Sequence, residues 1–320
     1  MVRRVWVLAS PQEHDAGMRG MIDSILRDIK EDRTTGAVEL VKKGVDALAL
    51  FITNYTGVSS FFFDELVRIS QKLIDSQPSM APFFNLTNVL LLAAEGEKDL
   101  EKMKRSTAEA IRGFLFHLQS SGERISKIAR ALIPEKSRVL THSYSSTVLR
   151  TLIDARKEGK PFEVICTESR PNLEGLLMAR KLSEAGINVQ VQIDSAAAYT
   201  IKDFDLVMVG ADCLTPFGLV NKVGTYGLAL AAKEKNIPFY ALCGTEKLLG
   251  AGMAKKYRIL RHDPKEVWRD PPQGVVVLNF YYDTTPIELL TAIFTEEGMI
   301  RGLDIIRRFQ RMRVANHFPQ

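Results

Sequence analysis

The stretch that decides the fold is RVLTHSYSSTVLRTL at residues 138–152, in which a short apolar run at 138–143 passes through serines and threonines into a helical pattern. Further short runs of β-branched and apolar residues follow it, and most of them also lead into a helical segment: 162–167, 189–193, 206–209, 238–242 and 275–278. Continuous apolar strands that alternate with helices, as at 173–185 and 224–235, are typical of a parallel sheet covered on both faces. The sequence therefore predicts an α/β fold with a Rossmann-like, doubly wound parallel sheet.

The N-terminal part of the chain has a different pattern. Apolar residues recur at helical spacing in four segments, near 21–29, 36–52, 61–75 and 97–133. Only residues 5–8 resemble a strand there. A chain of 320 residues usually forms two domains. We therefore expect an N-terminal helical domain at residues 1–122 and the Rossmann-like α/β domain at residues 123–320.

Composition and charge exclude several classes of protein. Apolar residues make up 46% and charged residues 25% of the chain, as in an ordinary globular protein. The net charge of +5 is too dilute to indicate nucleic-acid binding by itself, because such binding needs clustered basic residues. The densest basic stretch is 301–313, in which Leu303, Ile306, Phe309 and Met312 fall near helical spacing. We interpret it as an amphipathic helix with a solvated or partner-facing basic side, and contact with RNA or an acidic partner is the alternative.

The cysteines and the N-terminus indicate a cytoplasmic protein. Cys166, Cys213 and Cys243 form no CxxC pair and have mostly apolar neighbours, which is typical of buried strand residues in a reducing compartment. The apolar run VWVLA near the N-terminus is shorter than the ~7–15 residues of a secretory signal. No run approaches the ~20 residues that cross a bilayer. We therefore expect no membrane association, no metal and no cofactor.

Polar residues follow the first predicted strand, and the carboxyl ends of strands are where doubly wound sheets bind ligands. Ser143, Ser145, Ser146 and Thr147 mark the change from strand to helix. Hydroxyl groups beside the free N–H groups of a helix start suit a phosphate, and plain helix capping is the alternative. His142 and Ser143 are adjacent in the predicted strand and point to opposite faces, so they cannot act together as base and nucleophile.

Later strand ends add charged residues to the same edge of the sheet. Glu168 and Arg170 follow the second strand, and Asp212 follows the fourth. A carboxylate there fits a general base, an acceptor for a ribose hydroxyl or a helix cap. Asn221 and Lys222 are expected to begin the helix NKVGTYGLALAAKEK, where a lysine opposes the helix dipole unless an anion lies there. The sequence therefore predicts a site for a small phosphorylated molecule.

Seven motifs, taken in order, resemble a known family. They are THSYSSTVL, TESRPNLEG, IDSAA, VGAD, NKVGTYGLAL, DTTP at 283–286 and TEEG at 295–298. Together they resemble the alpha/beta/delta regulatory subunits of initiation factor 2B, especially the archaeal members, over about residues 33–300. The same superfamily includes methylthioribose-1-phosphate isomerase and ribose-1,5-bisphosphate isomerase. The resemblance implies a helical N-terminal domain and a Rossmann-like C-terminal domain, through which the protein mainly dimerises.

The sequence departs from the isomerases at one of the two residues that act on the sugar. The isomerases have an aspartate and a cysteine there; Asp212 matches the aspartate, whereas Ser143 stands at the cysteine position. A thiol has a pKa of ~8.5 and an alcohol is a far weaker acid. Ser143 is therefore expected to hydrogen-bond a sugar hydroxyl rather than to move a proton. Arg170 matches an isomerase arginine in TESRP.

Three further departures concern the phosphate contacts of the isomerases. Gln77 stands at the arginine of an Arg-Pro pair, and Glu174 stands at the glutamine of RPxxQG. Thr35 replaces an arginine that precedes Gly-Ala, here Gly36 and Ala37, and the resemblance places Gly36 at the ligand. Each lost arginine removes charge-assisted contacts worth roughly 1.5–3 kcal/mol, and Glu174 is expected to repel phosphate.

We therefore expect a regulatory-type protein of this family that binds a sugar phosphate or nucleotide without isomerase turnover, as a homodimer or larger oligomer. The resemblance also points to initiation factor 2 as a partner. The first alternative is an aldose–ketose sugar-phosphate isomerase of the ribose-1,5-bisphosphate type, in which Asp212 acts with Ser143, or with a water in place of the thiol. The second alternative is a module that binds RNA or a membrane surface through the basic segment 301–313.

Overall fold

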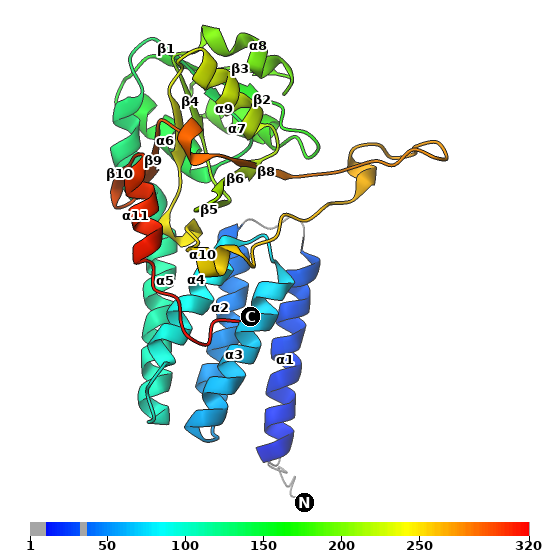
Figure 1. Ribbon diagram of the computed structural model, residues 1–320, viewed down its shortest axis with the longest axis vertical. Helices are drawn as coiled ribbons and strands as arrows, with labels where there is room; N and C mark the ends of the chain where they lie inside the picture. The colour runs from blue at the N-terminus through cyan, green and yellow to red at the C-terminus, as the bar shows by residue number, and fades with distance from the viewer. Residues whose placement is uncertain (1–10, 33–36, 320) are drawn as a thin grey trace, which may run out of the picture. The chain divides into compact units, whose positions relative to one another are not determined.

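Two units make up the chain, and a computed structural model describes residues 11–32 and 37–319 of it (Figure 1). One unit comprises Met1–Phe116 and Val314–Gln320, and the other comprises His117–Arg313. Of residues 11–16 and 303 only the backbone is described. No helix in the described ranges is long and apolar enough to cross a membrane.

The first unit is helical. Its helices are α1 (Pro11–Glu31), α2 (Ala37–Asn54), α3 (Ser59–Ser76), α4 (Ala81–Ala94) and, as far as Phe116, α5 (Leu100–Ala129). In the interior, Phe51 of α2 stacks on Phe62 of α3 with 5.0 Å between ring centroids. Gly44 lets α2 approach its neighbours, because a Cβ there would lie 3.0 Å from Leu73 and Phe83. The predicted N-terminal helical region is therefore confirmed, while the strand considered at 5–8 lies outside the described residues.

A seven-stranded sheet in the order β10-β9-β7-β4-β1-β2-β3 forms the second unit. Its strands are β1 (Ser137–Thr141), β2 (Phe162–Thr167), β3 (Asn188–Gln192), β4 (Leu206–Val209), β7 (Phe239–Leu242), β9 (Ala292–Thr295) and β10 (Gly298–Ile300). Neighbouring strands are parallel except β10, which is antiparallel to β9. Leu206 and Met208 of β4 belong to one apolar cluster and Val207 and Val209 to another, so the sheet is buried on both faces.

Helices cover both faces of this sheet. The end of α5, α6 (Ser146–Lys157) and α7 (Glu174–Glu184) supply one apolar cluster. The other contains residues of α8 (Ala196–Thr200), α9 (Thr225–Glu234) and α11 (Leu303–Arg311). The remaining short helices are η1 (Arg130–Leu132), η2 (Ile201–Asp203), η3 (Thr245–Lys247), α10 (Ala251–Ala254), η4 (Pro264–Glu266) and η5 (Ile287–Leu289). This arrangement confirms the predicted doubly wound α/β fold.

The strand order reverses between β1 and β4. From β1 the chain moves outward to β2 and β3, and it then returns to β4 on the other side of β1. The connections after β1 and β4 therefore diverge, and the carboxyl ends of these two strands, called the crevice below, are where doubly wound sheets bind ligands.

A small antiparallel sheet of β5 (Cys213–Thr215), β6 (Gly218–Lys222) and β8 (Tyr282–Thr285) was not predicted. The prediction that Asn221 and Lys222 begin a helix was wrong, because both belong to the buried strand β6. The helix α9 begins at Thr225, after Gly224 in a left-handed conformation with φ of 107°. Three cysteines are buried as predicted, although Cys243 follows β7 rather than lying in it.

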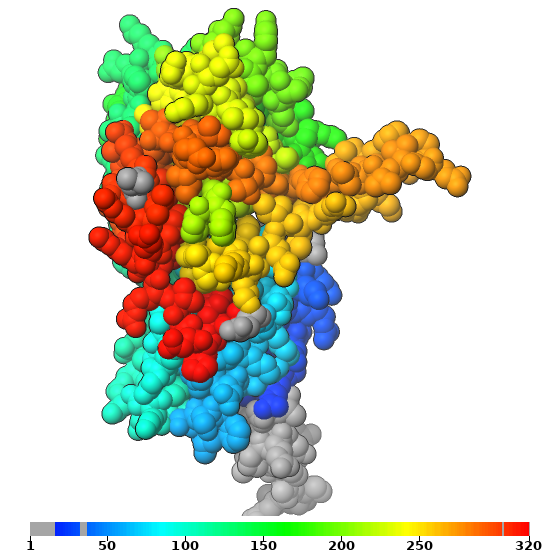
Figure 2. Space-filling view, viewed as in Figure 1, coloured from blue at the N-terminus to red at the C-terminus, as the bar shows by residue number. Residues whose placement is uncertain are grey.

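The strand predicted at 275–278 was also wrong. Its apolar residues are largely exposed, Val276 by 82%, and no sheet partner lies beside this run in the described structure. The run belongs to a segment at 255–281 that projects from the α/β unit (Figure 2). Eight large apolar side chains are exposed along it: Ile259, Leu260, Val267, Trp268, Val275, Val276, Leu278 and Phe280.

The basic segment 301–313 forms α11, but its apolar stripe differs from the predicted one. Ile305 and Phe309 are buried, whereas Ile306 is 48% exposed. Two arginines of the helix form ion pairs: Arg307 with Asp304 at 3.0 Å and Arg308 with Glu297 at 2.5 Å. Part of its positive charge is therefore already balanced.

Candidate ligand site at the strand switch point

The crevice at the switch point brings together residues that follow β1 and β4. Ser143 and Ser145 follow β1, and Asp212 follows β4. Gly210 allows the two loops to touch, because a Cβ at this position would lie 2.6 Å from Ser145 Oγ. The first turn of α6, with its free N–H groups, begins at the same place.

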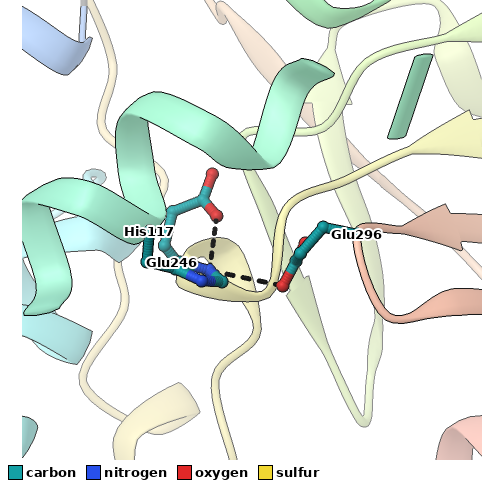
Figure 3. Close-up of side chains that lie close together, drawn as sticks. All are labelled: His117, Glu246 and Glu296. Atoms are coloured by element: carbon teal, nitrogen blue, oxygen red, sulfur yellow. Dashed lines mark ion pairs between the residues drawn. The ribbon is translucent and has the colours of Figure 1, made fainter. Parts of the chain in front are cut away.

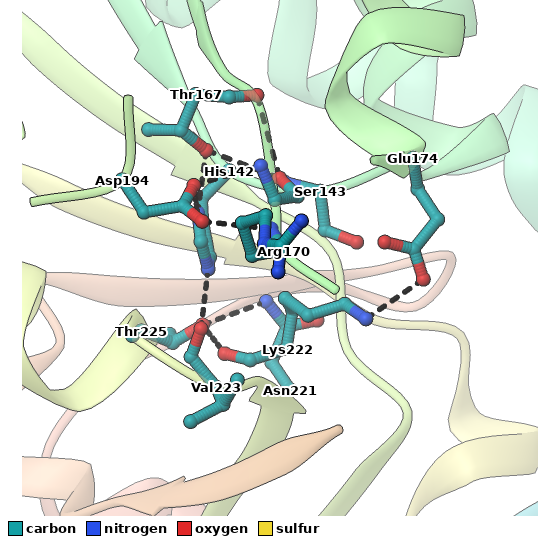
Figure 4. A network of polar contacts seen from close by, with 12 residues as sticks. His142, Ser143, Thr167, Arg170, Glu174, Asp194, Asn221, Lys222, Val223 and Thr225 are labelled. Carbon is teal, nitrogen blue, oxygen red and sulfur yellow. Dashed lines mark hydrogen bonds and ion pairs between the residues drawn. The ribbon is translucent and has the colours of Figure 1, made fainter. Parts of the chain in front are cut away.

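His142 is a buried structural residue of this crevice (Figure 4). Its Nε2 lies 2.9 Å from the Val223 carbonyl oxygen, which only accepts, so Nε2 carries the proton. In the neutral ring, Nδ1 then accepts from Thr167 Oγ1 at 2.6 Å. Burial lowers the pKa of His142, which favours this neutral form. Both ring nitrogens are thus engaged, and His142 ties the end of β1 to β2 and to the turn before α9.

Ser143 adopts an unusual backbone conformation. Its φ of 68° lies in the left-handed region, which costs a non-glycine residue of the order of 1–3 kcal/mol. The Ser143 N–H donates to Ser169 Oγ at 2.8 Å, which holds this turn. In Figure 4 the Ser143 hydroxyl points toward the Glu174 carboxylate. The strand thus ends before Ser143, which presents its hydroxyl to the crevice.

Lys222 and Glu174 form the ion pair of the site. Lys222 Nζ lies 2.7 Å from Glu174 Oε1, and the lysine side chain is 4% exposed while that of Glu174 is 30% exposed. The ammonium also lies 4.8 Å from the centre of the Tyr281 ring. Within the described structure, Glu174 Oε2 is buried and accepts no hydrogen bond. The anion that compensates Lys222 is therefore a side chain of the protein itself, which corrects the interpretation of this lysine as a misplaced charge awaiting a ligand.

Asp212 lies in the same environment as this pair. Burial raises the pKa of the Asp212 carboxyl, Lys247 and Lys222 lower it, and Glu174 raises it further. Asp212 in turn is the main cause of the raised pKa of Tyr282, which faces Lys222 across β6 and β8. These mutual effects require the charges to lie close together.

The other predicted site residues have different roles. Ser145 is the N-cap of α6, where its hydroxyl accepts from the Val148 N–H at 3.3 Å, while Ser146 and Thr147 form the first turn. Asn221 is buried and donates to Thr225 Oγ1 at 3.0 Å. Three remaining residues are placed as follows: Glu168 is half-buried after β2, Arg170 is exposed and donates to the Val267 carbonyl, and Gly36 lies outside the described residues.

Two aspartates outside the predicted set hold the loops of the crevice. Asp194 accepts the N–H groups of Ser169 and Arg170, both at 2.7 Å. Asp283 accepts from the Gly224 N–H at 2.7 Å and from the Tyr226 N–H at 3.1 Å, and so caps α9. Their only sequence signal was their position after a predicted strand or in the DTTP motif.

The fold and this crevice define a doubly wound α/β protein with a polar site at its strand switch point. The model of the initiation factor 2 subunit family matches residues 33–302, and the chain therefore belongs to this family. The resemblance drawn from the seven motifs is confirmed.

Relatives of both functional types are similar to this chain. The crystal structure of translation initiation factor eIF-2B from Pyrococcus horikoshii OT3 superimposes with a TM-score of 0.71 at 31% identity, covering 88% of this chain and 96% of that one. The ribose 1,5-bisphosphate isomerase of Archaeoglobus fulgidus is 34% identical over 280 residues, 85% of this chain and 87% of the relative. The methylthioribose-1-phosphate isomerase of Heliobacterium modesticaldum is 32% identical over 295 residues, 85% of each chain. Overall similarity does not distinguish the initiation-factor type from the isomerase type, so the residues of the site have to distinguish them.

Proposed function

We propose that this chain is a regulatory-type member of the family, which binds a sugar phosphate or nucleotide in the crevice without isomerase turnover. The observation that carries the proposal is the 2.7 Å ion pair between buried Lys222 and Glu174, with the Ser143 hydroxyl beside it. These groups suit hydrogen bonds to a polar ligand, and Ser143 stands where the isomerases have a thiol.

The chemistry of aldose–ketose isomerisation explains why Ser143 is inadequate. The reaction moves a proton between neighbouring carbon atoms and needs an acid and a base with pKa values near the working pH. A serine hydroxyl meets this demand only when a base activates it. The adjacent His142 is not available as that base, because Thr167 and Val223 engage both nitrogens of its ring. Ser143 therefore serves as a hydrogen-bonding group.

The same residues indicate which part of a ligand goes where. The free N–H groups at the start of α6 suit a phosphate. The carboxylates of Glu174 and Asp212 only accept hydrogen bonds when ionised, so they suit sugar hydroxyls or the amino group of a base. Two carboxylates near Lys222 disfavour a second phosphate group. A monophosphate with several hydroxyl groups matches this distribution better than a bisphosphate.

Isothermal titration calorimetry with the full chain tests the proposal. Ribose 5-phosphate, ribose 1,5-bisphosphate and adenosine monophosphate form a suitable panel. We expect at least one monophosphate to bind in a ratio of one per chain, more tightly than the bisphosphate. Binding of the bisphosphate alone, or of none of the three, would argue against this assignment of the crevice.

One observation favours the isomerase as a second candidate. Asp212 has a raised pKa and lies in the crevice, as a general base does. If Asp212 is such a base, Asp212→Asn removes turnover while the phosphorylated ligand still binds. In the regulatory-type account, Asp212→Asn changes only the affinity, which calorimetry measures.

We also propose that the protein forms homodimers through the α/β unit and that initiation factor 2 is a partner. The eight exposed apolar side chains on the segment 255–281 support an interface, because monomers rarely expose such a group together. Sedimentation equilibrium should give a dimer, and Trp268→Glu together with Val276→Glu should shift the protein toward monomers. A wild-type monomer at micromolar concentration would contradict the dimer.

A further inference from the structure

A second cluster of polar side chains lies in the α/β unit, beside the ends of β7 and β9 (Figure 3). Glu246 belongs to η3, which follows β7, and Glu296 lies in the turn between β9 and β10. The two strands are parallel neighbours, and the Cys243 N–H donates to the Phe294 carbonyl at 2.9 Å, so their ends are held side by side. His117 of α5 reaches the same point and completes the cluster.

The spacing of the three side chains matches a metal site. His117 Nε2 lies 3.5 Å from Glu246 Oε2 and 3.3 Å from Glu296 Oε1, and the three ligand atoms lie within 4.8 Å of one another. A tetrahedral Zn²⁺ with bonds of about 2.05 Å separates neighbouring ligand atoms by about 3.3 Å. The distances from the imidazole to both carboxylates therefore fit already, and a rotation of the Glu246 carboxylate would close the remaining gap.

We propose that His117, Glu246 and Glu296 bind a divalent transition-metal ion, with Zn²⁺ as the best match. One imidazole nitrogen and two carboxylate oxygens are a donor set that zinc accepts, leaving a fourth position for water or another ligand. Calcium and magnesium prefer oxygen ligands alone, so the histidine disfavours them.

Thr245 supplies the support that a metal ligand usually has. Its N–H donates to Glu296 Oε2 at 3.1 Å, and its hydroxyl donates to Glu296 Oε1, which fixes the carboxylate. With its proton used in this way, Thr245 Oγ1 accepts from His117 Nε2 at 2.9 Å. A metal ion on Nε2 takes the place of this proton, so the Thr245 hydroxyl must rotate away from Nε2 or become a further ligand.

Burial favours a doubly charged ion over a single imidazolium. The side chains of Glu296 and Glu246 are 0% and 5% exposed, which is costly for carboxylates unless positive charge compensates them. A divalent ion brings two positive charges to the two carboxylates, whereas a protonated His117 brings one. His117 is 28% exposed, which leaves a path for the ion to enter. From the sequence we expected no metal, and that expectation rested on the cysteines alone. His117, Glu246 and Glu296 are far apart along the chain, so no local motif indicated them.

Zinc titration of the untagged full chain, freed of metal by a chelator, tests the site. Competition with a chromophoric chelator should show one Zn²⁺ per chain. His117→Gln and Glu296→Gln should each weaken binding on the order of 100-fold or more, beyond the 10–100-fold typical of supporting residues such as Thr245. Glu297→Gln is the matched control, because Glu297 is exposed in the same turn and pairs with Arg308. It should bind Zn²⁺ like the wild type.

Cobalt substitution gives a second readout. Co²⁺ in a four-coordinate site should produce visible absorption in the wild type and in Glu297→Gln, but not in His117→Gln. Circular dichroism verifies that each variant is folded. If Glu296→Gln does not fold, the binding measured for His117→Gln, whose substituted side chain is partly exposed, tests the proposal by itself. The proposal is overturned if the wild type binds no stoichiometric Zn²⁺, or if His117→Gln binds it with unchanged affinity.

Discussion

The two polar clusters of the α/β unit compensate buried charge in different ways. In the crevice at β1 and β4, the ammonium of Lys222 lies 2.7 Å from the carboxylate of Glu174, and Asp212 and Lys247 add one further ionisable group of each sign. At β7 and β9, two carboxylates, Glu246 and Glu296, surround the single imidazole of His117. Both lie at the carboxyl ends of strands of one sheet.

The difference determines what each cluster can bind. The ion pair of Lys222 and Glu174 has little net charge, so a phosphate must compete with Glu174 for Lys222. The hydroxyl groups of a ligand therefore suit this pair better than its phosphate does. Two carboxylates and one imidazole within 4.8 Å of one another are a donor set that suits a cation. One fold thus presents two candidate sites, one for an organic ligand and one for a metal ion, which differ in their charged groups.

The largest effect is expected from the residue next to the ion pair. A Cβ at Gly175 would lie 1.7 Å from the Thr167 carbonyl oxygen of β2, and backbone cannot move aside as a side chain can. Gly175→Ala should therefore push α7 away from the sheet and destabilise the protein by roughly 3 kcal/mol or more, as measured by urea unfolding.

Gly227→Ala in α9 is the control, because nothing lies within 4 Å of a Cβ there. It should stabilise slightly, by about 0.5–1 kcal/mol. Equal effects of the two substitutions would contradict the close contact between α7 and β2.

Removal of the buried cation should have the next largest effect. Lys222→Met keeps the apolar stem but removes the charge, so we expect a phosphorylated ligand to bind on the order of 30-fold more weakly, which corresponds to ~2 kcal/mol. Calorimetry with the monophosphate that binds best measures the change. Lys233→Met on the exposed side of α9 should leave the affinity unchanged. An equal loss of affinity in Lys222→Met and Lys233→Met would show a general effect of the protein's charge.

Removal of the carboxylate should act in the opposite direction. Glu174→Gln frees Lys222 for the ligand and removes a repelling charge, so phosphate affinity should rise by about tenfold, or ~1.4 kcal/mol. The gain should be larger for ribose 1,5-bisphosphate than for a monophosphate. Weaker binding of both ligands would show that Glu174 contacts the ligand rather than restraining Lys222.

The smallest effect concerns the pH dependence of stability. The pKa of His142 is lowered by burial, so below pH ~6.5 the unfolded chain takes up a proton that the folded chain does not. This residue therefore contributes a loss of stability as the pH falls below ~6.5, of at most about 1.4 kcal/mol per pH unit. His142→Gln should show a shallower decline between pH 6.5 and 5 in urea unfolding. Identical slopes in the two proteins would mean that His142 is not held neutral.

The main sheet was largely predictable from the sequence. The runs at 162–167 and 206–209 coincide with β2 and β4, because buried parallel strands are short and continuously apolar. The apolar run at 275–278 has the same local pattern without forming a strand. A strand forms only where a neighbouring strand can pair with it, whatever its local pattern. Asn221 and Lys222 lie in a strand because β6 pairs with β8.

The sequence predicted which edge of the sheet carries these residues but not how their charges are paired. Parallel strands bring their carboxyl ends to one edge, and Ser143 and Asp212 follow the neighbouring strands β1 and β4 there. The partner of Lys222 is Glu174, and no local rule joins two residues so far apart in the chain. Glu174 was expected to repel phosphate, and the structure shows that it forms an ion pair with Lys222. The left-handed turn at Ser143 also depends on a distant residue, Ser169.

A steady-state assay for conversion of ribose 1,5-bisphosphate to ribulose 1,5-bisphosphate tests the central claim most directly. With the purified full chain, we expect no product beyond the amount formed by Asp212→Asn under the same conditions. Sustained turnover by the wild type that Asp212→Asn abolishes would contradict the claim and identify the crevice as an isomerase active site.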